Sequence, residues 1–222
     1  MAKHLHRELD KIKRHILSLG ALVEERVHLA AETIPTRDAA SAKKIIDSDW
    51  EIDEMEVEVE EECLKILALY QPVAVDLRFL VATIKINNDL ERIGDEAVNI
   101  SERVVTMSKR PDPGFVFDYT SMAQKAQSML KMSLDALVNL DVDLAFKVIT
   151  LDDSVDAIKK EAYDQIKEAI IQKPERVGYM INLLLISRHL ERLADHCTNI
   201  AEEIIYLIEG EIIRHEKYET QE

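Results

Sequence analysis

Four pairs of acidic residues are the side chains of this sequence with the most obvious chemistry. Within each pair the two acids lie four positions apart, so a helix would place both carboxylates on one face. Carboxylate oxygens are hard ligands that suit Mg, Ca, Mn or Fe, and Zn tolerates them. Two acids at this spacing repel one another, and a bound multivalent cation would remove that repulsion. The four pairs are Asp49/Asp53, Glu91/Asp95, Asp152/Asp156 and Glu191/Asp195.

Two of these pairs belong to a phrase that the sequence carries twice. Residues 87–100 read NNDLERIGDEAVNI, and residues 187–200 read SRHLERLADHCTNI. In each copy an amide, Asn99 or Asn199, follows the second acid by one helical turn and could add a neutral oxygen ligand. The other two pairs repeat as well, at an offset of 103 residues. The shared order of acids and amides therefore indicates a duplicated unit.

Helix breakers divide the chain into six segments. Gly and Pro number five each, which favours long helices over a turn-rich β architecture. Inside the segments apolar residues recur at spacings of three and four, the period of an amphipathic helix. We therefore predict an all-α protein of two tandem, pseudo-symmetric three-helix bundles, six long antiparallel helices in all, over residues 1–110 and 111–222. The division points are Pro35 with Thr36 as the following N-cap, Pro72, the linker Pro111-Asp112-Pro113-Gly114, Leu140-Asp141 with a capping acid, and Pro174.

The second and third helices of each half form a hairpin that is predicted to bring the acid pairs together. Residues at equal chain distance from the turn of an antiparallel hairpin lie at similar height, because both helices rise equally per residue. In the first half the turn is centred on Pro72, so Asp53 faces Glu91 and Asp49 faces Asp95. The same rule in the second half gives the facing pairs Asp156/Glu191 and Asp152/Asp195.

The acids are predicted to face away from the interior of their own bundle. On a helical wheel they lie opposite the apolar stripe of the same helix, and the solvated face of an ordinary amphipathic helix has the same pattern. Both interpretations therefore stay open. The second site could bind differently from the first, or not at all, because Arg188-His189 replaces Asn88-Asp89 ahead of the shared Leu-Glu-Arg. The two apolar stripes are Leu90, Ile93, Ala97, Ile100 and Val104, and Leu190, Leu193, Cys197, Ile200 and Ile204.

Composition excludes several classes of protein. The 222 residues carry 43 acidic against 28 basic side chains, a net charge of −15, whereas a nucleic-acid binder presents a basic face. No apolar run is long enough for a membrane span, and the charged N-terminal stretch does not resemble a signal peptide. Cys63 and Cys197 form no disulfide framework and are expected to be buried thiols in a reducing cytosol. We therefore expect a cytoplasmic protein.

The sequence resembles the PhoU family of regulators of bacterial phosphate uptake and signalling, over about residues 10–210. Three features carry the resemblance: the four acid pairs, the phrase Asp76-Leu77-Arg78-Phe79-Leu80 after Pro72, and residues 88–95 followed by Asn99-Ile100. The second half departs from the pattern, because it lacks the Asp-Leu-Arg phrase and has Gly178-Tyr179-Met180 in that region.

The resemblance implies two symmetric three-helix bundles whose acid pairs bind multinuclear metal clusters, of iron or zinc. It also implies a cytoplasmic homodimer that links the ATPase of a phosphate ABC transporter to a membrane-bound sensor histidine kinase. Such a protein regulates phosphate homeostasis negatively, repressing the phosphate-starvation response when phosphate is plentiful. It reaches the membrane only through its partners.

Two other interpretations compete with a metal-binding signalling adaptor that has no enzymatic activity. A di-iron oxidase of the helical-bundle type needs two Glu-x-x-His motifs on partner helices, and the sequence has only Glu25-Arg26-Val27-His28. A structural adaptor of another transporter, without a metal, is the third candidate. The single tryptophan, Trp50, is expected to pack in the core.

Overall fold

The computed structural model describes residues 2–110 and 114–213, and every regular element in these ranges is a helix. The prediction of an all-α fold is therefore confirmed. Pro111, Asp112 and Pro113 of the predicted linker lie outside the described residues. In chain order the elements are α1 (Ala2–Thr36), α2 (Ala39–Asp47), α3 (Trp50–Tyr70), α4 (Ala74–Ser108), α5 (Thr120–Asn139), α6 (Val142–Gln172), a 3-10 turn η1 (Pro174–Arg176) and α7 (Val177–Glu209).

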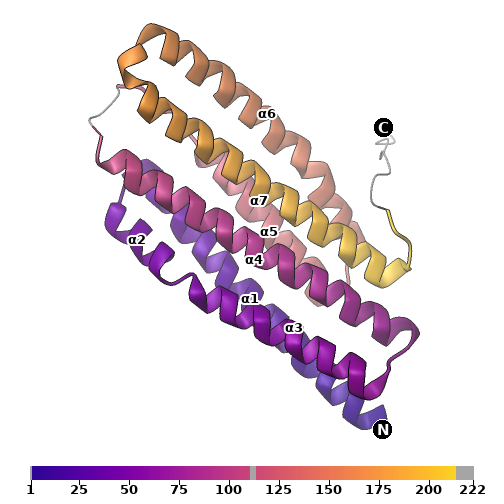
Figure 1. The fold of residues 1–222 in the computed structure, drawn as a ribbon. Helices are drawn as coiled ribbons and strands as arrows, with labels where there is room; N and C mark the ends of the chain where they lie inside the picture. Colours follow the sequence, from indigo (N-terminus) through magenta and orange to yellow (C-terminus); the bar gives the residue numbers. More distant parts are fainter. Residues whose placement is uncertain (1, 111–113, 214–222) are drawn as a thin grey trace, which may run out of the picture.

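The helices form two layers, as Figure 1 shows. The front layer holds α3, α4, α7 and α6 side by side, and α1 and α5 pack behind it. The first half thus contributes α1 to α4 and the second half α5 to α7, with α4 against α7 at the junction between the halves. This arrangement agrees with tandem three-helix bundles, while the exact division into residues 1–110 and 111–222 stays a prediction.

The first half differs from the prediction in one respect, because its second helix is split in two. The chain turns at Ser48 and Asp49 between α2 and α3, whereas α6 runs unbroken through the corresponding residues of the second half. The backbone N–H of Ser48 bonds back to the carbonyl of Ile45 and closes α2 with a tight turn. Asp49 therefore stands at the N-terminus of a helix rather than inside one.

Local signals explain most helix ends. The prediction of Thr36 as an N-cap is wrong: α1 continues through Pro35 to Thr36, whose hydroxyl donates to the Glu32 carbonyl. Asp38 caps α2 instead, because its carboxylate accepts from the N–H groups of the first turn. Asp141 caps α6 as predicted, by accepting from the N–H of Leu144.

The turns of both hairpins lie where the prolines place them. Residues 71–73, around Pro72, separate α3 from α4, and Lys173 with η1 separates α6 from α7. Because these two turns fix which residues of each hairpin are level, they also fix the positions of the acid pairs.

The core contains both predicted stripes, together with apolar residues of the other helices. All ten of their residues are at most 1% exposed, and the two cysteines are buried free thiols, as expected. Burial of this apolar surface is the main stabilising term for a helical bundle.

A close approach of α3 to α4 occurs beside the acid pairs. A Cβ added to Gly94 would lie 2.9 Å from Cδ1 of Ile52, so only glycine fits there without a shift. The second half has Ala194 and Val155 at the corresponding positions, and both are fully buried. A larger residue on one helix is thus matched by a smaller one on its partner, which keeps the core volume of the two hairpins similar.

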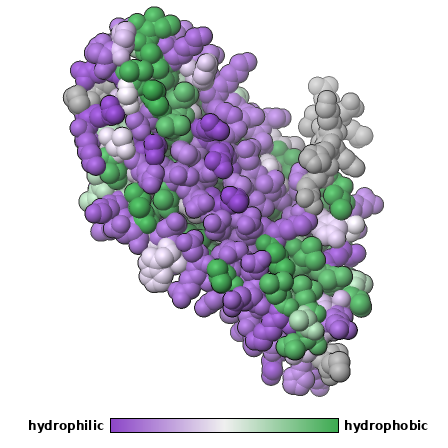
Figure 2. Space-filling view, viewed as in Figure 1, coloured by the Kyte–Doolittle hydropathy of each residue, from purple (hydrophilic) through white to green (hydrophobic). Residues whose placement is uncertain are grey.

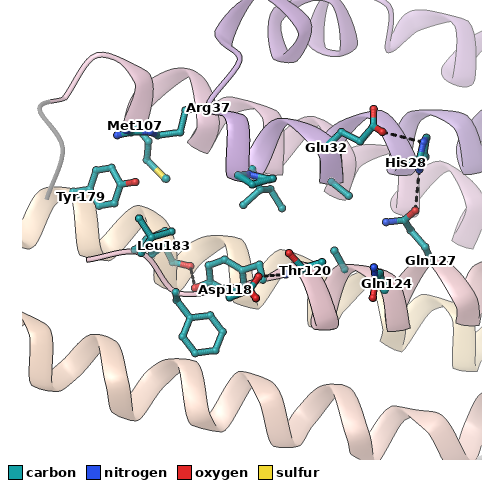
Figure 3. A pocket seen from close by; sticks show the side chains of 17 residues that line it. His28, Glu32, Arg37, Met107, Asp118, Thr120, Gln124, Gln127, Tyr179 and Leu183 are labelled. Atoms are coloured by element: carbon teal, nitrogen blue, oxygen red, sulfur yellow. Dashed lines mark hydrogen bonds and ion pairs between the residues drawn. The ribbon is translucent and has the colours of Figure 1, made fainter. Parts of the chain in front are cut away.

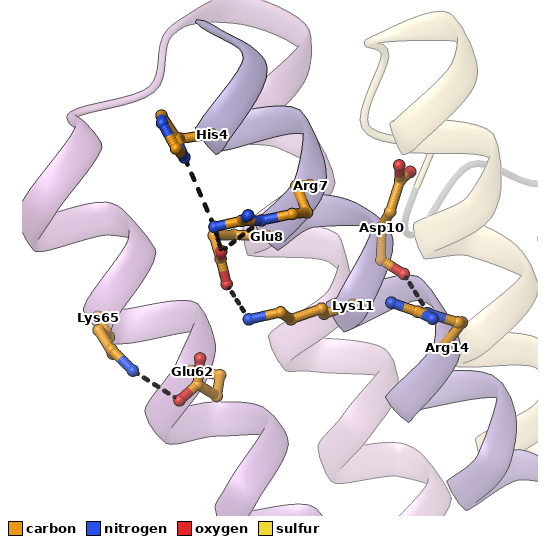
Figure 4. A network of polar contacts seen from close by, with 8 residues as sticks. All are labelled: His4, Arg7, Glu8, Asp10, Lys11, Arg14, Glu62 and Lys65. Atoms are coloured by element: carbon orange, nitrogen blue, oxygen red, sulfur yellow. Dashed lines mark hydrogen bonds and ion pairs between the residues drawn. The ribbon is translucent and has the colours of Figure 1, made fainter. Parts of the chain in front are cut away.

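The surface is mostly polar. Figure 2 shows a hydrophilic centre on the face formed by α3, α4, α7 and α6, with apolar patches toward the two ends of the molecule. Ion pairs between residues three apart lie at the surface, such as Lys11–Glu8 on α1 and Lys65–Glu62 on α3 (Figure 4). Trp50 is 59% exposed, so the expectation that it packs in the core is wrong. Within residues 2–110 and 114–213, none of the helices is both long enough and apolar enough to cross a bilayer.

Candidate metal centre

The first hairpin brings its four predicted acids into one cluster, which we call the first cluster: Asp49, Asp53, Glu91 and Asp95. Partial burial, together with the negative charges of Asp53 and Asp95, raises the pKa of Asp49 to about 6. Burial also raises the pKa of Asp95, with Asp53 as the next cause, and the pKa of Glu91, with Asp95 as the next cause. These mutual effects cross from α3 to α4, so the carboxylates lie close enough to repel one another, as the hairpin rule predicts.

The second hairpin repeats this arrangement in the second cluster: Asp152, Asp156, Glu191 and Asp195. Burial, together with the charges of Asp195 and Asp156, raises the pKa of Asp152 to about 6. The pKa of Asp195 is raised by burial first and by Glu191 second. The two halves therefore concentrate negative charge at corresponding places.

All eight acids lie at the surface of their bundles. Each is half-buried or exposed, and none is fully buried. The outward orientation predicted from the helical wheel is therefore present, and a buried di-iron cage would have required the opposite orientation.

The donor set fits a hard multivalent cation, since each cluster supplies only carboxylate oxygens. The ligands are not fully assembled, however. In the part of the chain that the structure describes, no three Asp, Glu, His or Cys side chains converge into a ready-made metal-binding group. Metal uptake would therefore require rotation of these side chains about their own bonds, which their surface position permits.

The two asparagines that were predicted as additional ligands make contacts outside the clusters. The amide nitrogen of Asn99 donates to Oε2 of Glu96 over 3.4 Å, and that of Asn199 donates to Oδ1 of Asp89 over 3.2 Å. Their role as metal ligands stays a prediction that depends on their carbonyl oxygens.

A set of polar contacts between the halves was not predicted from the sequence. On α4, Glu96 is 2% exposed; its Oε2 lies 2.6 Å from Nδ1 of His189, and its Oε1 lies 3.2 Å from Nη1 of Arg192, both on α7. Asp89 and His196 form the symmetry-related pair at 2.8 Å. One signal was available: at the two positions that pair across the junction, an acid in the first copy of the repeat becomes histidine in the second.

A cavity away from the acid clusters is lined by groups that hold the chain in place. About 630 Å³ in volume, it lies between the end of α1 and the start of α5 and α7 (Figure 3). The hydroxyl of Tyr119 donates to the carbonyl of Leu183 over 2.5 Å, and Asp118 accepts from the N–H of Thr120. These polar groups fix the segment that enters α5. Because their hydrogen bonds serve the fold, we place the candidate site at the carboxylate clusters instead.

The raised pKa values predict an unusual dependence of stability on pH in the absence of metal. Asp49 and Asp152 have an ordinary pKa of 3.8 when unfolded and about 6 when folded, so the folded state binds more protons between these values. Their contribution to stability is therefore fully present below about pH 4 and is lost as the pH rises through 6. We expect D49N/D152N to melt several degrees above the wild-type chain at pH 7.5 in chelator, and the gap to close toward pH 4.

Thermal melts between pH 4 and pH 8 check this expectation. The matched control is D10N/D164N, which removes two exposed carboxylates outside the clusters. If both double variants differ from the wild-type chain by the same melting temperature, the total charge of the protein, rather than crowding in the clusters, sets the pH dependence.

Fold and site together define an internally duplicated, all-α protein with one carboxylate cluster on each hairpin. The PhoU domain family model matches residues 16–104 and 119–204, one match in each half. A phosphate-specific transport system accessory protein PhoU homolog from Pseudomonas aeruginosa is 34% identical over 97% of this chain and 89% of its own length. The homolog from Aquifex aeolicus is 35% identical over 96% of each chain.

Solved structures agree. The crystal structure of PhoU from Pseudomonas aeruginosa matches with a TM-score of 0.90 and 34% identity, over 93% of this chain and 99% of that one. The phosphate transport system regulatory protein PhoU from Streptococcus pneumoniae matches with a TM-score of 0.83 and 29% identity, over 94% and 98%. The chain belongs to the PhoU family, and the resemblance inferred from its motifs is confirmed.

Proposed function

We propose that this chain is a cytoplasmic, metal-binding regulator of phosphate uptake, without enzymatic activity. The observation that carries the proposal is the membership of both halves in the PhoU family, whose relatives are named as accessory proteins of a phosphate-specific transport system. On this proposal the chain associates with the phosphate ABC transporter through the ATPase of that transporter. It also contacts a sensor histidine kinase and represses the phosphate-starvation response when phosphate is abundant.

The clusters support the metal-binding part of the proposal. Carboxylates that raise one another's pKa create an electrostatic demand for positive charge, and a multivalent cation satisfies it with several bonds. Asp49, Asp53, Glu91 and Asp95 would hold the cation in the first cluster. When bound, it would supply neutralising charge and link α3 to α4, so it would set the shape of the surface offered to a partner.

The metal is proposed to be divalent or trivalent: iron or zinc on the family resemblance, with Mg, Ca or Mn compatible with the same oxygens. We further propose that the chain forms a homodimer and reaches the membrane only through its partners. It is proposed to have no nucleic-acid partner.

The oxidase alternative has little support from the residues that it would use. Its one Glu-x-x-His motif lies on α1, where Nδ1 of His28 lies 3.1 Å from Oε1 of Gln127 on α5 and Nε2 lies 3.4 Å from Glu32. Oxygen consumption by iron-loaded protein tests that alternative directly, and rapid turnover would establish it.

Co-purification from cells tests the regulatory proposal. Tagged chain is recovered from cells grown in high or low phosphate, and the bound proteins are identified by mass spectrometry. We expect the phosphate transporter ATPase and a sensor kinase in the high-phosphate sample. A phosphate-starvation promoter fused to a reporter should also become active at high phosphate when the gene is deleted. Recovery of the ATPase of a different transporter, together with an unchanged reporter, would favour the structural adaptor instead.

A further inference from the structure

The two clusters differ in charge at one position that the repeat makes directly comparable. Asp53 corresponds to Asp156, and three residues later on the same helix the first half has Glu56 where the second half has Lys159. Residues three apart share a helix face, so each of these side chains lies beside its cluster. The duplicated unit has therefore reversed a charge next to the carboxylates.

In the second cluster, the ammonium of Lys159 lies among the acids. Its Nζ is 2.5 Å from Oε1 of Glu191 on α7 and 3.8 Å from Oδ1 of Asp156 on α6. The hydrogen bond to Glu191 is the main reason why the pKa of Lys159 is raised, and the charge of Lys159 also opposes the upward shift of the Asp195 pKa. One cation of the chain itself thus acts on three of the four carboxylates.

In the first cluster, Glu56 adds a negative charge instead. The buried amide of Asn87 holds it beside α4 by donating to its carbonyl over 2.8 Å and to its Oε1 over 3.1 Å. Burial raises the pKa of Glu56, and Glu60 and Asp53 raise it further.

Three arginines act on the first cluster from a distance, without pairing with its carboxylates. The charge of Arg26 opposes the upward shift of the Asp49 pKa, and the charge of Arg92 opposes that of Glu91 and Asp95. Arg26 pairs with Glu51 at 2.6 Å, and Arg192 pairs with Glu96 at 3.2 Å. Within residues 2–110 and 114–213, no Lys or Arg nitrogen lies within 4.0 Å of a carboxylate of Asp49, Asp53, Glu91 or Asp95.

Two further positions near the clusters are neutral in the first half and basic in the second. Lys160 and Arg188 in the second half correspond to Val57 and Asn88 in the first. Both basic residues line a groove of about 940 Å³ beside the second cluster, together with Lys159 and Arg192. The groove next to Glu56, of about 460 Å³, is lined by more acids than bases: Glu56, Glu60, Asp89, Glu202 and Glu203 against Lys85.

We propose that only the first cluster takes up a multivalent metal ion, and that Lys159 serves as the built-in counter-cation of the second. The inference rests on the proposed metal-binding function and refines it. An incoming ion at the second cluster would have to displace the ammonium from Glu191 or bind within a few ångströms of a like charge. The ammonium has no lone pair to offer a metal, whereas the carboxylate of Glu56 adds a further oxygen ligand.

Exchanging the two charges tests the inference. The number of Mn²⁺ ions bound per chain, and their affinity, are measured by titration calorimetry and elemental analysis on the full chain. We expect K159E to bind about twice as many ions as the wild-type chain, because its second cluster then matches the first in charge. We expect E56K to lose the wild-type binding, and E56K/K159E to regain it through the second cluster.

Matched variants separate charge from damage to the fold. K167E makes the same charge change at an exposed site on α6 and should bind as the wild-type chain does. E56Q and K159A repeat the test without charge reversal, and E56Q should weaken binding about tenfold or more by removing one charged ligand. Circular dichroism shows whether each variant is folded.

The outcomes distinguish the inference from the proposed function. If neither the wild-type chain nor K159E binds Mn²⁺, zinc or iron, the metal-binding function itself fails. If the wild-type chain binds metal but both E56K and K159E bind the same number of ions as it does, the metal-binding function stands and the assignment to the first cluster is wrong.

Discussion

Neutralising the first cluster should abolish the stabilisation of this chain by metal. In D49N/D53N/E91Q/D95N, we expect the melting temperature to be insensitive to Mn²⁺, whereas that of the wild-type chain rises. A ligand present at 1,000 times its Kd stabilises the folded state by about 4 kcal/mol. For a chain of this size each kcal/mol corresponds to about 2–4 °C, so the expected rise for the wild-type chain is roughly 8–16 °C. Thermal melts with chelator and with Mn²⁺ measure it.

The same variant should be more stable than the wild-type chain when both are in chelator. Four amides at these positions keep the shape of the side chains. They remove the cost of partly burying a charge and the mutual repulsion, which together raise the pKa values of Asp49, Glu91 and Asp95. The two effects have opposite signs, and a variant with a merely damaged fold would melt lower under both conditions.

A control with the same change in charge completes the experiment. D10N/E61Q/D164N/E168Q removes four exposed carboxylates outside the clusters and should keep the wild-type response to Mn²⁺. An undiminished rise in the first-cluster variant would show that the metal binds elsewhere on the chain.

Hairpin geometry made the clusters predictable from the sequence. The rise per residue is the same on both arms of an antiparallel helical hairpin, so Pro72 alone determines that Asp53 is level with Glu91. The apolar stripes were predictable for a similar reason, because the helical period decides which side of α4 carries Leu90 and Ile93.

The exposure of Trp50 was not predictable from residue type alone, because it depends on where a helix begins. The chain breaks at Ser48 and Asp49, so Trp50 is the first residue of α3. At 100° per residue it lies about 200° from Ile52, which is 1% exposed. The side chain that follows the break therefore points to solvent, although tryptophan usually packs in a core.

Contacts between the halves could not be predicted from the sequence either. Whether Glu96 pairs with His189 depends on which faces of α4 and α7 meet, and neither hairpin constrains the other. The role of Lys159 was missed for a different reason. Lys159 is not part of the repeated pattern of acids, because the second half has a base where the first half has an acid, Glu56.

The junction between the halves supplies the second large effect, since Glu96→Ala should destabilise the whole chain. Removing one partner of a buried, paired charge costs about 3–5 kcal/mol. We expect about 3 kcal/mol, the lower end of that range, because Arg192 is 43% exposed and can turn to water, whereas His189 cannot. The corresponding fall in melting temperature is roughly 6–12 °C, and urea denaturation at pH 7 measures the free energy of unfolding directly.

The dependence on pH identifies the cause of that loss. Burial alone would raise the pKa of Glu96, but the hydrogen bond and charge of His189, with the charge of Arg192, hold it below the usual 4.5. A carboxylate with a lowered folded pKa contributes stability above its unfolded pKa and loses it as the pH falls through the folded value. The deficit of Glu96→Ala should therefore be complete at pH 7 and shrink below about pH 4.5. Glu102→Ala, an exposed acid on the same helix, should change stability by less than about 0.5 kcal/mol. Equal stabilities for these two variants would mean that the contacts of Glu96 with α7 contribute nothing to holding the halves together.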